Sequence, residues 1–125
     1  MIAVDTSSWI AFLSGASGPD VRLVEQALDD RLACLPPVVL TELLSDPELP
    51  ESVAALLVEL PRLALKDGYW ERAGALRAKL LAMKRKAPLA DALIAQSCLD
   101  HDVRLVTRDG DFRHFARAGG LKLLP

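Results

Sequence analysis

Four carboxylates stand at positions where an α/β chain would gather chemically active side chains. Asp5 directly follows the apolar segment at residues 2–4, and Asp109 comes two residues after another apolar segment. Glu42 is the only charge within an apolar helical stretch, and Asp91 falls in the first turn of a further expected helix. Taken one at a time, each has an ordinary explanation: a helix cap, turn chemistry, a solvated position or a favourable interaction with the helix dipole.

Taken together, the same carboxylates indicate a cation site. Two carboxylates about 5 Å apart repel each other by roughly 3 kcal/mol at an effective dielectric constant of 20. Several of them at one place are therefore costly unless a cation lies among them, and Mg²⁺ and Mn²⁺ prefer such oxygen ligands. A carboxylate-held metal can promote phosphodiester hydrolysis without a catalytic histidine, because it activates water and neutralises charge on the phosphate.

The elements that must position these residues alternate between strands and helices. Apolar or alternating segments predict strands at residues 2–4, 32–35, 63–65, 103–107 and 121–124. Helices are expected at residues 9–13, from Pro19 onward, and at residues 38–44, 50–60, 67–84, 88–99 and 112–117. This alternation is typical of a mostly parallel sheet, whose ligands bind beyond the carboxyl ends of the strands. Asp5 and Asp109 would then share one edge of the sheet.

Length and composition exclude several other classes of protein. The chain has 125 residues, the usual size of one domain, so we expect residues 1–125 to form a single domain. Its content of 51% hydrophobic and 26% charged residues excludes disorder, and no apolar run is long enough for a membrane span. The N-terminus lacks the basic region of a signal peptide. Cys34 and Cys98 are too few for a disulfide framework, which predicts buried free thiols and a cytoplasmic location.

Four segments of the chain, in order, resemble the PIN-domain ribonucleases, and most closely the VapC toxins of toxin–antitoxin pairs. The segments are residues 2–11, 39–43, 88–95 and 105–112, and they contain Asp5, Glu42, Asp91 and Asp109 respectively. Each fragment alone is weak evidence. The four in sequence, closed by Thr-Arg-Asp-Gly-Asp-Phe at residues 107–112, form a more specific pattern that covers essentially the whole chain.

The resemblance implies a three-layer PIN-like fold, with a five-stranded, mostly parallel sheet flanked by helices. It also implies that Asp5, Glu42, Asp91 and Asp109 form one catalytic site, in which Asp5, Asp91 and Asp109 bind Mg²⁺ or Mn²⁺. Either Thr6 or Ser7, together with Thr107, matches polar supporting positions of the family. Asp109 and Asp111 compete for the fourth acidic place. We prefer Asp109, because it is nearer the strand end and Asp111 is well placed to cap the following helix.

The implied activity is that of a metal-dependent endoribonuclease, the toxin of a VapBC-type pair. Its implied partners are RNA, a cognate VapB-type antitoxin seated in a groove between the early helices, and further copies in a homodimer or toxin–antitoxin hetero-oligomer. No membrane partner is expected. Residues 63–125 carry 12 basic and 7 acidic side chains, so this half is the better suited to a polyanion. The basic residues that we expect to hold RNA as a group are Arg72, Arg77, Lys79, Lys84, Arg85, Lys86, Arg104, Arg108, Arg113 and Arg117.

Two other functions remain open from the sequence. The first is a PIN-like domain that binds RNA without cutting it, although all four acidic positions are filled. The second is a phosphoacceptor domain of the receiver type. That type requires an acidic pair near the first strand and a lysine after a late strand. Here no carboxylate follows Asp5 before Asp20, and Arg108 follows the late strand.

Overall fold

The computed structural model describes residues 1–125 and contains a four-stranded, wholly parallel sheet. Its strands are β1 (Ile2–Val4), β2 (Ala33–Cys34), β3 (Arg104–Val106) and β4 (Leu123–Leu124). Their order across the sheet is β2-β1-β3-β4, so β1 and β3 are the central strands. Because the strands are parallel, their carboxyl ends lie along one edge. Asp5 and Thr107 are the first residues beyond the two central strands at that edge.

The expected fifth strand at residues 63–65 does not form, so the prediction of five strands is wrong. The chain there makes only an isolated parallel bridge between Leu35 and Arg62. Two backbone hydrogen bonds hold the bridge, from Leu35 N–H to the Pro61 carbonyl at 2.8 Å and from Leu63 N–H to the Leu35 carbonyl at 2.9 Å. Pro61 has no N–H with which to extend the ladder, and Leu65 is exposed. The segment therefore passes β2 without becoming a strand.

Seven helices connect and cover the strands. They are α1 (Thr6–Leu13), α2 (Pro19–Asp29), α3 (Pro37–Leu44), α4 (Glu51–Glu59), α5 (Tyr69–Ala82), α6 (Leu89–His101) and α7 (Phe112–Gly119). Proline occupies the first position of α2 and α3, where its missing N–H costs nothing. The helix expected over residues 67–84 is shorter at both ends. It begins after Gly68, whose φ of +81° suits glycine, and Lys84 leaves the helical region with a φ of +58°.

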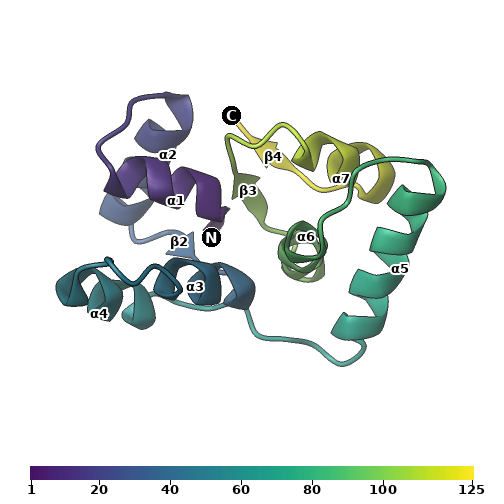
Figure 1. The fold of residues 1–125 in the computed structure, drawn as a ribbon, viewed down its shortest axis with the longest axis horizontal. Coiled ribbons are helices and arrows are strands. Elements are labelled where there is room, and N and C mark those ends of the chain that lie inside the picture. The colour runs from purple at the N-terminus through teal and green to yellow at the C-terminus, as the bar shows by residue number, and fades with distance from the viewer.

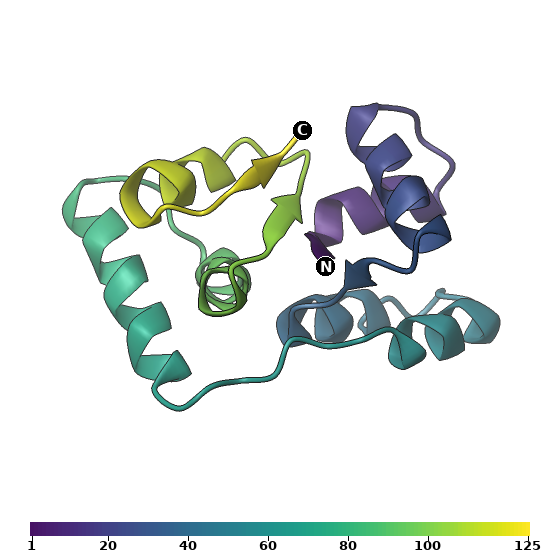
Figure 2. The same cartoon turned by 180° about the vertical axis from the view of Figure 1, so that it is seen from behind.

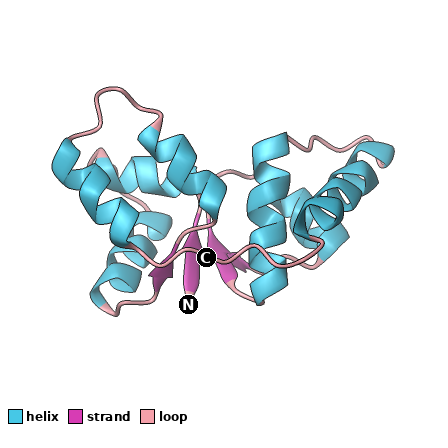
Figure 3. Ribbon diagram, turned by 90° about the horizontal axis from the view of Figure 1, so that it is seen from below, coloured by secondary structure: helices cyan, strands magenta, loops and turns pink.

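The helices form two groups. Helices α1 to α4 gather toward the β2 edge of the sheet and α5 to α7 toward the β4 edge, and α3 contacts α6 where the groups meet (Figure 1, Figure 2). Viewed from below, the strands fan out between the two groups (Figure 3). No helix combines the length and apolar character that crossing a membrane requires. The layered arrangement leaves the carboxyl ends of the strands as the meeting point of segments from the whole chain.

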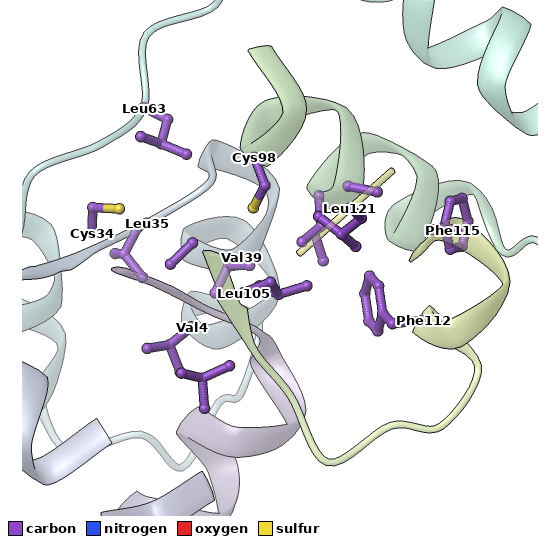
Figure 4. Packing of buried hydrophobic residues seen from close by; sticks show 14 of the residues in the cluster. Val4, Cys34, Leu35, Val39, Leu63, Cys98, Leu105, Phe112, Phe115 and Leu121 are labelled. Atoms are coloured by element: carbon purple, nitrogen blue, oxygen red, sulfur yellow. The ribbon is translucent and has the colours of Figure 1, made fainter. Parts of the chain in front are cut away.

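Both layers contribute to one hydrophobic cluster of 23 buried residues. Val4 and Leu105 from the central strands lie near Val39 of α3, and the rings of Phe112 and Phe115, both from α7, have their centroids 5.8 Å apart (Figure 4). Cys34 and Cys98 are buried in the structure as free thiols. Burial raises the pKa of Cys34 to about 11, which keeps that thiol protonated and unreactive.

Candidate functional site

Asp5 is held at the sheet edge by contacts to both neighbouring segments. Its backbone N–H donates to the Val106 carbonyl at 2.8 Å. Its Oδ2 accepts hydrogen bonds from Ser7 Oγ at 2.7 Å, from Thr107 Oγ1 at 2.9 Å and from Ser7 N–H at 3.4 Å. The residue therefore does cap α1, but Oδ1 accepts no hydrogen bond. Asp5 is 4% exposed, and burial raises the pKa of its carboxyl above the ordinary value, despite the hydrogen bonds that oppose the rise.

Thr107 connects Asp5 to Asp109. Its hydroxyl donates to Asp5 Oδ2 and accepts a hydrogen bond from the Asp109 N–H at 3.0 Å. Asp109 Oδ1 in turn accepts from the Asp111 N–H at 2.9 Å, which closes a short turn after β3. Only Oδ2 of Asp109 is left without a hydrogen bond. The loop thus presents one free carboxylate oxygen beside the one that Asp5 presents.

Glu42 is positioned from the opposite direction by α3. Its Oε1 accepts a hydrogen bond of 2.7 Å from Thr6 Oγ1, so the start of α1 holds this carboxylate too. Thr6 and Ser7, the two alternatives for a supporting position, both contact a candidate carboxylate. Thr6 contacts Glu42, and Ser7 contacts Asp5. Glu42 lies in the exposed part of the site, and its Oε2 accepts no hydrogen bond.

Asp91 differs from the other three because its carboxylate accepts no hydrogen bond from any side chain or backbone group outside its helix. It lies in the first turn of α6, partly buried. Burial, followed by the negative charges of Asp5, Asp109, Glu42 and Asp111 in that order, raises its pKa to about 7. The structure therefore brings Asp5, Glu42 and Asp109 close enough to Asp91 for their charges to act on it.

The donor set fits a hard divalent cation, although the side chains are not yet in coordinating positions. No three acidic, histidine or cysteine side chains converge tightly enough to hold an ion. Each of the four carboxylates nevertheless has at least one oxygen that accepts no hydrogen bond. Every donor is oxygen, which suits Mg²⁺ or Mn²⁺ rather than zinc. A cation among these carboxylates would relieve their mutual repulsion.

Asp111 does not play the capping role expected of it. It occupies the N-cap position of α7 but makes no capping hydrogen bond with its side chain. Instead its Oδ2 lies 3.3 Å from Lys86 Nζ in a partly exposed ion pair. The charge of Asp109 raises the pKa of Asp91 more than that of Asp111 does. The choice of Asp109 as the fourth acidic residue stays a prediction, now supported by proximity instead of by capping.

Several basic residues expected to hold RNA are engaged within the protein. Arg108 forms a bidentate ion pair with Asp20, and Arg72 forms one with Asp100. Arg77 and Lys79 donate to backbone carbonyls. Within the expected RNA-binding set, the side chains without such partners are Lys84, Arg85, Arg104, Arg113 and Arg117. No local sequence signal indicated the contact of Arg108 with Asp20, because 88 residues separate the two.

Comparison with known proteins gives a consistent assignment. The PIN domain family model matches residues 2–118. Two curated relatives are VapC ribonuclease Mb1587 from Mycobacterium bovis and Ribonuclease VapC11 from Mycobacterium tuberculosis. Each is 30% identical over 130 residues, and the alignment covers 98% of this chain and 96% of the relative.

Solved structures agree on the fold. VapBC2 from Rickettsia felis bound to a DNA fragment from its promoter gives a TM-score of 0.76 at 20% identity, over 99% of this chain and 98% of the other. DNA-bound VapBC from Salmonella typhimurium gives 0.72 at 20% identity, with the same coverage. The match to the family model spans nearly the whole chain and includes all four candidate carboxylates. The chain therefore belongs to the PIN-domain family, and its curated relatives within that family are VapC ribonucleases.

Proposed function

We propose that the chain is a metal-dependent endoribonuclease that acts as the toxin of a VapBC-type toxin–antitoxin pair. Its relatives named VapC ribonucleases, aligned over 98% of the chain, support this activity. The observation that carries the proposal is the placement of Asp5 and Asp109 beyond the central strands, near enough to Asp91, as is Glu42, for their negative charges to add to burial in raising its pKa. Such crowding is costly in a purely structural role and useful in a cation site.

We further propose that Asp5, Asp91 and Asp109 hold Mg²⁺ or Mn²⁺, with Glu42 completing the catalytic site. PIN-domain ribonucleases are generally dependent on divalent metals, which supports this assignment. The bound ion would supply a Lewis acid that activates water and neutralises charge on the scissile phosphate.

The chain's own residues perform the positioning. Ser7 and Thr107 fix Oδ2 of Asp5 and leave Oδ1 free, and Thr6 does the same for Glu42. The turn after β3 fixes Asp109 by its Oδ1. The cations without internal partners are available to bind the RNA backbone. Arg113 is the best placed of these, because it lines a pocket of about 250 Å³ together with Asp109.

A groove beside the acidic site supports the proposed antitoxin partner. It has a volume of about 380 Å³ and is lined by Ile10, Leu13, Ser14, Glu42, Leu43, Asp46, Leu49 and Pro50. Its apolar part suits an amphipathic segment, and Glu42 at its edge suits a basic side chain of that segment. We also propose a homodimer or toxin–antitoxin hetero-oligomer, a single nuclease domain over residues 1–125, and a cytoplasmic location, to which the buried free thiols are suited.

The direct test is RNA cleavage by purified protein freed of antitoxin. Cleavage should require Mg²⁺ or Mn²⁺, stop with EDTA, and be lost in Asp5→Asn prepared in parallel, which controls for contaminating nuclease. Asp102→Asn is a matched control, because Asp102 is exposed and paired only with Lys122. Cleavage that survives full chelation would contradict the metal-dependent mechanism.

The two alternative functions give different results in the same preparation. RNA binding without cleavage by the metal-loaded wild type would favour an inactive PIN-like domain. Labelling of Asp5 by acetyl phosphate would favour a receiver. The structure gives the receiver little support, because Asp20, the next acidic residue after Asp5, is engaged by Arg108 and Ser8.

A further inference from the structure

A bidentate ion pair joins the start of α2 to the loop that carries Asp109. Arg108 Nε donates to Asp20 Oδ2 at 2.8 Å, and Arg108 Nη2 donates to Asp20 Oδ1 at 3.0 Å. Arg108 lies between Thr107, which bonds Asp5, and Asp109 itself. Two parallel charge-assisted hydrogen bonds of this kind fix orientation as well as distance.

Neighbouring residues make further contacts with both members of the ion pair. Asp20 is 4% exposed, and Oδ2 accepts a further hydrogen bond of 2.8 Å from the buried Ser8. Arg108 Nη2 also donates to the Ser17 carbonyl at 3.1 Å. Gly18 has a φ of +146°, and a Cβ there would lie 2.8 Å from Asp20 Oδ1 and 3.1 Å from Arg108 Nη2. Glycine thus satisfies both the backbone conformation and the close approach of the ion pair.

The position of the pair suggests a use beyond stability. The backbone of residues 107–109 is held at one end by β3 and by the contact of Thr107 with Asp5. Thr107 N–H also donates to the Leu124 carbonyl of β4 at 3.4 Å, but no backbone hydrogen bond joins Arg108 or Asp109 to the sheet. Arg108 supplies the next fixed point, and the carboxylate of Asp109 follows immediately.

We propose that Asp20 and Arg108 are positioning residues that fix the segment 107–109, so that Asp109 meets Asp5 and Asp91 at the metal centre. This inference rests on the proposed metal-binding function. It assigns to Arg108 an internal role in place of the RNA contact that its sequence neighbourhood suggests.

Electrostatics alone makes the opposite prediction for one variant. Arg108 is a cation next to an acidic site, so its removal by Arg108→Gln would strengthen the binding of a divalent cation through charge. Removal of Asp20 by Asp20→Asn would weaken it. If the pair acts by positioning, both substitutions weaken Mn²⁺ binding, and the double variant is no weaker than the poorer of the two single ones, because each breaks the same contact.

A matched control exists in the same molecule. Arg72 and Asp100 form an equally bidentate pair, with distances of 3.0 and 2.6 Å, that joins α5 to α6. Asp100 lies near the end of α6 opposite to Asp91. Asp100→Asn therefore removes a comparable contact without touching the loop after β3.

The first measurement is amide hydrogen exchange of the full-length, metal-free protein. In Asp20→Asn and Arg108→Gln, the amides of Asp109 and Asp111, which are bonded to Thr107 and Asp109 in the structure, should exchange at least about tenfold faster than in the wild type. In Asp100→Asn they should not change. Unchanged exchange in the Asp20 and Arg108 variants would overturn the proposal.

The second measurement is the dissociation constant for Mn²⁺, by calorimetry or electron paramagnetic resonance. We expect an increase on the order of tenfold in Asp20→Asn and in Arg108→Gln, as is usual when support of a ligand is lost, and a change within twofold in Asp100→Asn. Tighter binding in Arg108→Gln would overturn the positioning role. Failure of the wild type to bind Mn²⁺ would instead refute the proposed metal centre.

A milder variant guards against loss of folding. Arg108→Lys keeps the charge but forms at most one of the two hydrogen bonds, and should give an intermediate Mn²⁺ affinity. Circular dichroism establishes that each variant is folded at the temperature of the binding measurement. If a folded Arg108→Lys variant binds Mn²⁺ as tightly as the wild type, the charge at this position suffices and the two parallel hydrogen bonds of the guanidinium have no positioning role.

Discussion

Replacement of Asp91 by asparagine should stabilise the metal-free protein at alkaline pH. The Asp91 carboxylate accepts no hydrogen bond, so the substitution by asparagine breaks no such bond. It does remove a negative charge that is partly buried and faces the charges of Asp5, Asp109 and Glu42. An ordinary first-turn carboxylate would behave in the opposite way, because its loss removes a favourable helix-dipole interaction worth about 0.3–1 kcal/mol.

The pKa of Asp91 sets the size and pH range of this effect. The folded-state pKa of about 7 lies above the ordinary value of 3.8, so the folded state binds the proton more tightly than the unfolded state. The resulting stability is fully present below about pH 4 and is lost as the pH rises through 7. A shift of about three pKa units corresponds to about 4 kcal/mol at most. Because Asp91 keeps partial contact with water, screening reduces the expected gain to about 1–3 kcal/mol.

Thermal melts of the metal-free proteins at pH 5 and pH 8 provide the assay. At pH 8 we expect Asp91→Asn to melt about 5–10 °C above the wild type. At pH 5 we expect a difference of about 2–4 °C, because the Asp91 carboxyl is already ionised in the unfolded state at that pH. Added Mn²⁺ should raise the melting temperature of the wild type more than that of the variant. Glu51→Gln is the control, because Glu51 lies in the first turn of α4 away from the site, and it should not stabilise at either pH.

One result would refute this reasoning. If Asp91→Asn is destabilised equally at both pH values, and the wild type is indifferent to Mn²⁺, then Asp91 is an ordinary first-turn carboxylate. The four carboxylates would then not form a shared site in solution.

Three other predictions concern toxicity, core packing and thiol chemistry. Expression of the chain alone in bacteria should halt growth, whereas Asp91→Asn at a comparable soluble level should not; equal growth in several hosts would contradict the toxin role but not the nuclease. Phe112→Ala should lower the free energy of unfolding in urea by about 3–5 kcal/mol, because Phe112 is fully buried against Phe115, and a loss under 1 kcal/mol would contradict this packing. Cys34 and Cys98 should react with a thiol reagent only after unfolding, since both are buried; fast labelling of the native protein would show otherwise.

The order of elements and the parallel sheet could be predicted because their signals are local. Proline at the first position of α2 and α3, the apolar triplet before Asp5, and the alternating pattern before Thr107 each report on the structure at their own position. The failed strand at residues 63–65 shows the limit of such signals. The segment at residues 63–65 is at least as apolar as the last strand. Strand formation also depends on the backbone hydrogen bonds that the segment can make to β2, and Pro61 has no N–H to donate there.

The site was only partly predictable for the same reason. The positions of Asp5 and Asp109 at strand ends followed from the apolar pattern. That Glu42 and Asp91 approach the same edge depends on how α3 and α6 pack, and the sequence indicated it only through the resemblance to PIN-domain ribonucleases. The expected cap Asp111 makes no capping hydrogen bond and pairs with Lys86 instead. The contact of Asp20 with Arg108 depends wholly on tertiary folding.

The placement of β3 in the centre of the sheet has a consequence for synthesis of the chain on the ribosome. β1 is translated first, but one of its two neighbours, β3, begins only at Arg104. Until that strand has left the exit tunnel, Asp5 lacks both the backbone contact to Val106 and the hydroxyl of Thr107, and Asp109 has not been made. A nascent or prematurely released chain that ends before β3 therefore contains three of the four carboxylates and no assembled site. The topology thereby delays any cleavage of RNA until translation of the domain is nearly complete.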